Sequence, residues 1–157
     1  MNIKLFHHGK SNSKPLLDLE NEYLSRLKHY AQIEIIILPD AGTVSKTSIE
    51  NIKKQEGEQL LKQLKTGDLL FLFDENGKQY SSVEFADFFQ KKMNSGAKNL
   101  VLVTGGAYGF SEVVYKRANG QISISKMTFT HLMIRVLVAE QIYRAYSILR
   151  NEKYHHQ

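Results

Sequence analysis

Five short strand-like runs, separated by segments of helical periodicity, decide the architecture of this 157-residue chain. The runs are Ile3 to His8, Ile33 to Pro39, Leu69 to Phe73, Asn99 to Gly106 and Gln121 to Ser125. Runs that are apolar on both faces indicate a parallel sheet that is covered on both sides. We therefore predict an α/β fold, a parallel-sheet α/β/α sandwich. No linker or repeat interrupts it, so residues 1–157 are expected to form a single domain.

Helical segments are predicted between these runs and at the end of the chain. The first follows Pro15, and its apolar residues at helical spacing are Leu16, Leu19, Tyr23, Leu27 and Tyr30. The other predicted features are capping boxes at Thr47 with Glu50 and at Ser81 with Glu84, helices over Ser111–Asn119 and His131–Arg150, and a turn from Asp74 to Lys78.

The composition excludes several classes of function. The chain has no cysteine, so it has no disulfide framework, thiolate nucleophile or thiolate metal site. The first residues, MNIKLFHHGKSNSK, lack the apolar stretch of a signal peptide, and the dense apolar run Leu132 to Ala139 is too short to span a bilayer. We expect a soluble cytoplasmic protein. A formal charge of +5 is compatible with binding RNA phosphates and equally with a generic basic surface.

The last predicted helix is apolar on nearly all sides. A terminal helix of a small domain can hardly be enveloped by its own chain, so we expect a second subunit to cover it in a dimer. His131 and Arg135 lie one turn apart near its start. Because a buried guanidinium must be paired, Arg135 either forms a structural ion pair or contacts an anion or substrate.

Two segments after predicted strands could bind a ligand. In LVTGGAYGF, Gly105, Gly106 and Gly109 follow a strand, at the end of the sheet where α/β proteins bind ligands. The pattern is neither GxGxxG nor Walker A, so taken alone it favours a tight strand-to-helix turn slightly over a ligand site. SISKMTFTH joins the fifth strand to the last helix without glycine or proline. His7 and His8 point to opposite faces of their strand, and we expect no metal site.

Six segments together resemble a known family over the full chain. They are Gln55-Glu56-Gly57-Glu58, Asp74 to Lys78, TGGAYG, SKMTFTH, RVLVAEQIYRA and the terminal YHH. In this order they resemble the ribosomal large subunit methyltransferase H family of the SPOUT methyltransferases. The resemblance implies a C-terminal trefoil knot, a homodimer, and S-adenosylmethionine bound in the knotted loops. It also implies methylation at N3 of a pseudouridine in the 23S rRNA of the assembled ribosome.

The resemblance also implies particular site residues. Those for the cofactor are Phe73, Gly105, Ile124, Ser125, Lys126, Met127, Thr128 and Phe129. The catalytic candidates are His131, Arg135, Tyr154 and His155. The chain departs from the family's usual residues at Thr130, at Ala107-Tyr108 and at His156. The alternatives are a SPOUT methyltransferase acting on another RNA such as tRNA, a non-catalytic ribosome-binding module, and a small nucleotide-binding protein.

Overall fold

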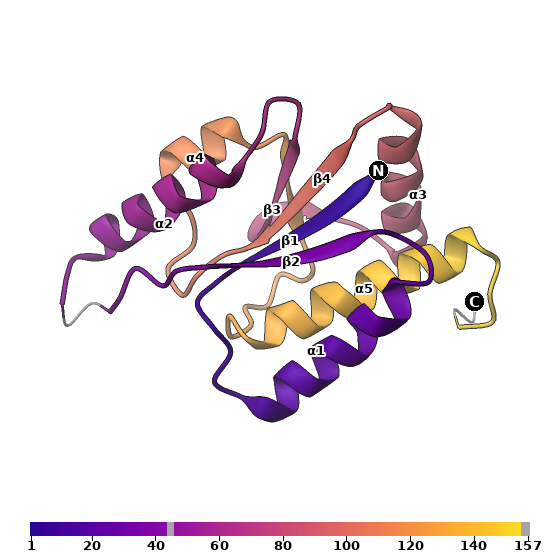
Figure 1. The fold of residues 1–157 in the computed structure, drawn as a ribbon, viewed down its shortest axis with the longest axis horizontal. Helices are drawn as coiled ribbons and strands as arrows, with labels where there is room; N and C mark the ends of the chain where they lie inside the picture. The colour runs from indigo at the N-terminus through magenta and orange to yellow at the C-terminus, as the bar shows by residue number, and fades with distance from the viewer. Residues whose placement is uncertain (44–45, 155–157) are drawn as a thin grey trace.

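The computed structural model, which describes residues 1–43 and 46–154, has one five-stranded parallel sheet at its centre. The strands are β1 (Asn2–His8), β2 (Ile33–Leu38), β3 (Leu69–Gln79), β4 (Asn99–Thr104) and β5 (Gly120–Ser123). Their order across the sheet is β2-β1-β4-β3-β5, and each pair of neighbours is parallel. The predicted α/β class with a parallel sheet is confirmed (Figure 1).

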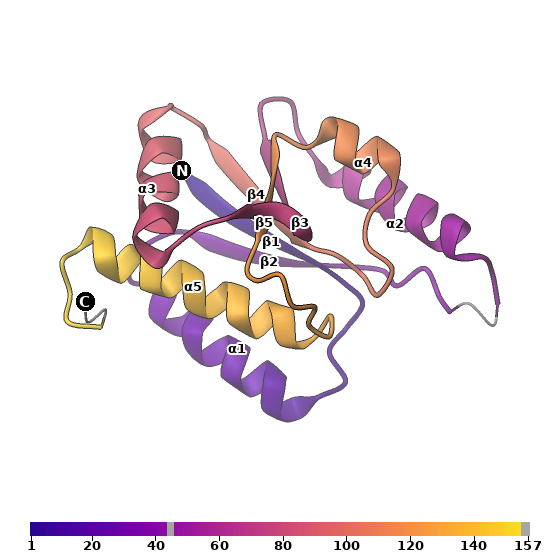
Figure 2. The same cartoon turned by 180° about the vertical axis from the view of Figure 1, so that it is seen from behind.

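Helices cover both faces of the sheet, as Figures 1 and 2 show. One face carries α1 (Lys14–Leu27), α3 (Ser82–Asn94) and α5 (Met133–Leu149), and the other carries α2 (Ile49–Gln63) and α4 (Glu112–Arg117). Each layer has its own buried core: Phe89 and Ile142 belong to the first, and Leu60 and Val114 to the second. Within the described residues, every helix is too short or too polar to cross a membrane.

Several predicted boundaries were right and two were wrong for identifiable reasons. The capping box of Ser81 and Glu84 is confirmed at the start of α3. The one at Thr47 is wrong, because α2 begins after Ser48, whose side chain accepts from the Asn51 amide at 3.2 Å. The helix predicted to reach Asn119 ends at Arg117, since the Asn119 backbone amide donates to the Leu70 carbonyl at 2.7 Å.

The apolar stripe predicted for α1 is also wrong in part. Leu19 is 40% exposed, whereas its neighbour Glu20 is only 5% exposed. The reason is an interaction that hydrophobicity cannot reveal: Glu20 Oε1 lies 2.9 Å from Nε2 of the buried His7 on β1. The helix is therefore rotated so that a carboxylate, and not a leucine, faces the sheet.

Helix α5 is enveloped by its own chain, which contradicts the reason given for a dimer. It packs between α1 and α3 on the sheet, and Val138 and Ile142 are completely buried in the single subunit. Most of its apolar surface is thus buried without a partner. The dimer remains a prediction that needs other support. His131 and Leu132 precede this helix and are not part of it.

The segment predicted as a turn after β3 is an interruption within the strand. Phe73 and Lys78 both pair with Ile122 of β5, so residues 74–77 bulge out of the sheet. Gly77 fits there because a Cβ atom would lie 2.6 Å from the Ile122 backbone. This bulge places Asp74 to Asn76 above the carboxyl end of the sheet.

Candidate active site

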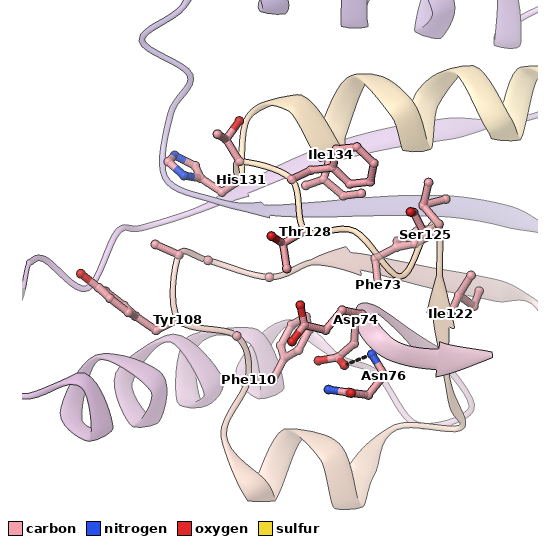
Figure 3. Close-up of a pocket in the computed structure, with 18 of the residues that line it drawn as sticks. Phe73, Asp74, Asn76, Tyr108, Phe110, Ile122, Ser125, Thr128, His131 and Ile134 are labelled. Carbon is pink, nitrogen blue, oxygen red and sulfur yellow. Dashed lines mark hydrogen bonds between the residues drawn. The ribbon is translucent and has the colours of Figure 1, made fainter. Parts of the chain in front are cut away.

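A cavity of about 590 Å³ lies at the carboxyl ends of β3, β4 and β5 (Figure 3). Residues 73–76, 105–110 and 122–134 contribute most of its lining. Parallel strands of a sheet place their carboxyl ends at one edge, and this is where α/β proteins bind ligands. The structure therefore brings together three chain segments that are far apart in sequence, and a cavity of this volume accommodates a small cofactor.

The bulge of β3 gives the cavity an acidic wall. The Tyr115 hydroxyl donates to Asp74 Oδ2 at 2.6 Å, and the Asn76 amide donates to Asp74 Oδ1 at 2.9 Å. Burial, together with Asp74, raises the pKa of Tyr115 to about 12, so the phenol stays protonated and keeps donating. The Asp74 carboxylate is held in one orientation and still has lone pairs free for a ligand.

The loop after β4 forms the second wall, and glycine is required in it. A Cβ at Gly105 would lie 3.2 Å from the Phe110 ring, and Gly109 has a φ of +76° that side chains rarely adopt. Phe110 is 4% exposed and packs edge-on against Tyr115. The glycines therefore allow the backbone to lie close to both the cavity and the aromatic floor beneath it.

The third wall runs from Ile124 to His131. Short serine and threonine side chains in and beside it form hydrogen bonds with nearby backbone amides and carbonyls. Ser123 Oγ donates to the Ser125 carbonyl at 2.8 Å, and the Met127 amide donates to Ser125 Oγ at 2.9 Å. Thr130 Oγ1 accepts from the Met133 amide at 3.3 Å. These bonds explain how a connection without glycine or proline holds a tight path around the cavity.

The predicted cofactor residues take different positions in this wall. Phe73 is 6% exposed and forms part of the cavity's inner surface, as do Ile124 and Ser125. Met127 and Phe129 line the cavity but remain 75% and 41% exposed. Lys126 lies outside, in a second hollow beside Glu75 and Asn76. The segment thus offers an apolar interior and an uncovered apolar rim.

His131 and Arg135 separate in space although they are one turn apart in sequence. His131 is exposed and lines the cavity. Arg135 is 2% exposed, is absent from the lining, and donates through Nη2 to the His8 carbonyl oxygen. Of the two alternatives for Arg135, the structure favours a structural contact.

A buried polar network lies beside Arg135 and below the glycine loop. His7 Nδ1 lies 2.7 Å from Thr104 Oγ1, the residue directly before Gly105, and its other nitrogen faces Glu20. Burial lowers the pKa of His7, although Glu20 opposes part of this shift. This network ties β1, α1 and the end of β4 together, so the loop starts from a fixed point.

The predicted tail residue Tyr154 lies far from the cavity of its own chain. Its ring packs edge-on against Tyr143 at 4.7 Å, the Arg144 guanidinium lies 4.8 Å from its ring centroid, and its hydroxyl donates to Glu140 Oε1 at 3.3 Å. Tyr143 is nine residues beyond Ile134 of the cavity wall, which is about 13 Å along the helix. His155 and His156 lie outside the described residues.

Comparison with known proteins assigns the chain to a family. The family model described as "Predicted SPOUT methyltransferase" matches residues 1–155. The chain belongs to the SPOUT methyltransferase family. It is 51% identical over all 157 residues to a protein of Flavobacterium johnsoniae named "Ribosomal RNA large subunit methyltransferase H", and 48% identical to one of that name from Parabacteroides distasonis. Both alignments cover the whole of both chains.

A solved structure supports the same SPOUT fold at much lower sequence similarity. "A probable methylase family protein from Haemophilus influenzae Rd KW20" aligns with a TM-score of 0.53 at 13% identity. The alignment covers 98% of this chain and 68% of that one. The family model and the curated relatives confirm, at the level of the family, the resemblance predicted from six short segments.

Sequence reasoning missed part of this SPOUT site. Asp74, Tyr115 and Ile134 line the cavity without having been predicted as site residues. For Asp74 a signal existed, because it directly follows a buried strand at the ligand-binding edge. Tyr115 and Ile134 sit on helices, and nothing in their spacing indicates the cavity. Across residues 1–43 and 46–154, no three His, Asp or Glu side chains are grouped to hold a metal ion.

Charge sets the cavity apart from the rest of the chain. Its described lining contains two carboxylates, Asp74 and Glu75, and no lysine or arginine, whereas the chain as a whole carries +5. Opposite charges attract strongly in a partly enclosed site. The SPOUT cavity is therefore suited to a small ligand that carries positive charge.

Proposed function

We propose that this chain methylates N3 of a pseudouridine in the 23S rRNA of the assembled ribosome, with S-adenosylmethionine as the methyl donor. The observation that carries the proposal is the cavity with an acidic wall and without basic lining among its described residues. A sulfonium cofactor with an added ammonium group matches this charge. The ribosomal target is supported by relatives named as ribosomal RNA large subunit methyltransferases, one of them 51% identical over its full length. This substrate also accounts for a cytoplasmic location.

The residues present fit such a cofactor. Phe73 and Ile122 are nearly buried apolar side chains that can pack against a purine ring. Gly105 and the backbone from Ile124 to Phe129 can approach its polar edge, as glycine and the self-bonded serine segment permit. Asp74 can accept from its hydroxyl or ammonium groups. The cofactor supplies an electrophilic methyl group, and the chain supplies position.

The N3 nitrogen of the pseudouridine must lose its proton as the methyl group arrives. His131 lines the cavity and is exposed at its mouth, so it is positioned to accept that proton as a general base. Arg135 does not contact the substrate in this proposal. It fixes the start of α5 and thereby the position of His131, which lies just before the helix. Tyr154 and His155 contribute to the substrate pocket of this proposal.

A homodimer is part of the proposal because Tyr154 lies away from the cavity of its own chain. Tyr154 is held at the opposite end of α5 by Tyr143 and Arg144. Exposed apolar side chains remain instead at the start of α5, where Phe129 and Met133 leave an apolar face uncovered. A second subunit packed antiparallel on this face would cover them and deliver its Tyr154 to the cavity.

A trefoil knot is the remaining part of the proposal. The chain passes from α4 on one face, through β5, to α5 on the other face. On the way, residues 124–131 line the same cavity as the β3 bulge and the loop after β4, which supports a path through these loops. General rules disfavour knots, with few exceptions. The cavity would then be built from the knotted loops themselves.

The deciding experiment is methyl transfer from labelled S-adenosylmethionine to four substrates. These are ribosomes with the pseudouridine, ribosomes lacking it, free rRNA and tRNA. We expect incorporation only into the first, with the label at N3 by mass mapping. Labelling of tRNA instead would assign a different RNA, and no labelling together with no calorimetric binding of the cofactor would reject the proposal.

A further inference from the structure

Glu56 is a buried acid directly beneath the glycine loop of the cavity. It is 6% exposed and belongs to α2, in the segment Gln55 to Glu58. A Cβ atom built on Gly106 would lie 2.6 Å from Glu56 Oε2 and 3.0 Å from Oε1. The carboxyl group therefore supports the loop from the side opposite the cavity, and none of the roles above uses it.

The next residue explains how this acid comes so close. A Cβ at Gly57 would lie 2.5 Å from Ser111 Oγ and 3.0 Å from Val114 Cγ2 of α4. Only a residue without a side chain lets α2 and α4 pack at this distance. Gly57 thus brings α2 against the loop-to-helix junction, and Glu56 is carried underneath Gly106.

The surroundings of Glu56 disfavour its charge. Burial raises the pKa of Glu56 to about 7, and the nearby Asp40 at the end of β2 adds to the shift. The Ala41 backbone amide opposes it in part by donating to the carboxyl group. The other groups that pack here, Gly106 and the residues of α4 against Gly57, carry no charge. Asp40 itself faces Gly9 and the neutral His8.

We propose that Glu56 is a positioning residue: in its neutral form it supports Gly106 and holds residues 105–109 in the shape that binds the cofactor. The inference rests on the proposed function, because it concerns the same cavity. Once ionised, Glu56 and Asp40 are two like charges in a poorly solvated space, and they repel. The repulsion is relieved by moving Glu56 outward, which removes the support from the loop.

The direction of the pH effect follows from this. If the cofactor-binding shape requires neutral Glu56, affinity is full below pH 7 and declines as the pH rises above it. Between pH 6 and pH 8.5 the Kd rises by up to about thirtyfold, the limit if only the neutral form binds. Glu56→Gln keeps the shape of the neutral acid and cannot ionise, so its affinity does not share this decline.

The test measures the Kd for S-adenosylmethionine by calorimetry at pH 6 and pH 8.5. At pH 6 we expect Glu56→Gln to bind like the wild type and Glu56→Ala to bind more weakly. At pH 8.5 Glu56→Gln should bind more tightly than the wild type. Titration of the cofactor's own amino group affects every protein equally, so it cancels in the ratio of the variant's Kd to the wild-type Kd at the same pH. Glu58→Gln, the same change at an exposed position of α2, is the matched control and should follow the wild type.

A second variant tests the contact without using pH. Gly106→Ala places a methyl group where the Glu56 carboxyl lies, so we expect the Kd to rise roughly fivefold or more at pH 6. In a Glu56→Ala background the added methyl group has no carboxyl group to displace, so Gly106→Ala should raise the Kd much less. A double-mutant cycle measures this coupling. Additive effects of the two changes would overturn the proposed support.

Hydrogen exchange of the cofactor-free protein separates this inference from the proposed function. Protection of the amides in residues 105–109 should fall from pH 6 to pH 8.5 in the wild type but not in Glu56→Gln, after correction for intrinsic rates. If the wild type binds no S-adenosylmethionine, the cofactor assignment fails, while this measurement still decides the role of Glu56. Equal protection in both proteins at both pH values overturns it.

Discussion

The two ends of α5 use the same kinds of side chain in opposite ways. At its start, Arg135 is 2% exposed and donates to the His8 carbonyl, next to the buried His7. Toward its end, Arg144 lies over Tyr154, and Arg150 beyond the last turn lies over Tyr30, both at partly or fully exposed positions. The first arrangement fixes a cavity; the second presents aromatic and basic groups at the surface.

In the proposed function, the difference follows from what each end binds. A small cofactor needs walls that do not move, and buried hydrogen bonds around the cavity hold those walls in place. A large RNA or a second subunit needs surface groups that stack and pair, which tyrosine and arginine provide. The helix itself, with 17 residues and a length of about 25 Å, keeps the two functions apart within one chain.

Removal of residues 154–157 gives the largest expected effect. We expect rRNA methylation to be abolished, because in the proposed dimer the tail completes the substrate pocket of the partner, while the Kd for S-adenosylmethionine changes little. Methylation assays and calorimetry on the same preparation measure both. The control is Glu58→Gln, which should leave both values unchanged.

Mixing experiments then ask whether the tail acts across subunits. Truncated chains, refolded together with full-length chains that carry Gly105→Leu in the cavity, should regain up to about a quarter of the wild-type rate. Random pairing makes half of the dimers mixed, each with one intact site. Full activity of the truncated protein alone would show that the two ends of α5 do not cooperate.

Arg135→Ala has the largest expected effect on stability. The change leaves the His8 carbonyl without its donor and opens a cavity in a buried region. We expect the free energy of unfolding to fall by about 3 kcal/mol. Urea unfolding measures this, and Arg135→Lys should recover part of the loss. A change below 0.5 kcal/mol, about the effect of an ordinary surface substitution, would contradict the structural role.

Acid should weaken the buried end in part through His8. Burial, with the nearby Arg135, lowers the pKa of His8 from 6.5 to about 4. Between these two pH values His8 is protonated in the unfolded chain and neutral in the folded one. Its contribution is present above pH 6.5 and is lost at about 1.4 kcal/mol per pH unit as the pH falls toward 4. The difference in unfolding free energy between wild type and His8→Gln isolates it. Parallel pH dependences would contradict the assignment.

The sequence predicted the sheet, its helices and the edge where the cavity lies, since apolar periodicity reports burial directly. It did not predict Glu20 facing the core, because a carboxylate in an apolar layer is explained only by its partner His7. It predicted Gly105 but not Asp74, whose role depends on a strand interruption that pairs Phe73 and Lys78 with one residue. Contacts between segments that are distant in the sequence are seen only in the folded structure.

Arg150→Ala has the smallest expected effect and sharpens the contrast with Arg135. Its guanidinium lies 5.7 Å from the Tyr30 ring centroid, and Tyr30 is also held by a 2.6 Å bond to Glu152. An exposed cation–π contact contributes about 1 kcal/mol or less, so the unfolding free energy should fall by less than that in urea. Cofactor affinity should not change, because Arg150 is at the far end of α5 from the cavity. A loss comparable to that of Arg135→Ala would mean that both ends of the helix are structural, and that the aromatic–basic surface is not reserved for binding.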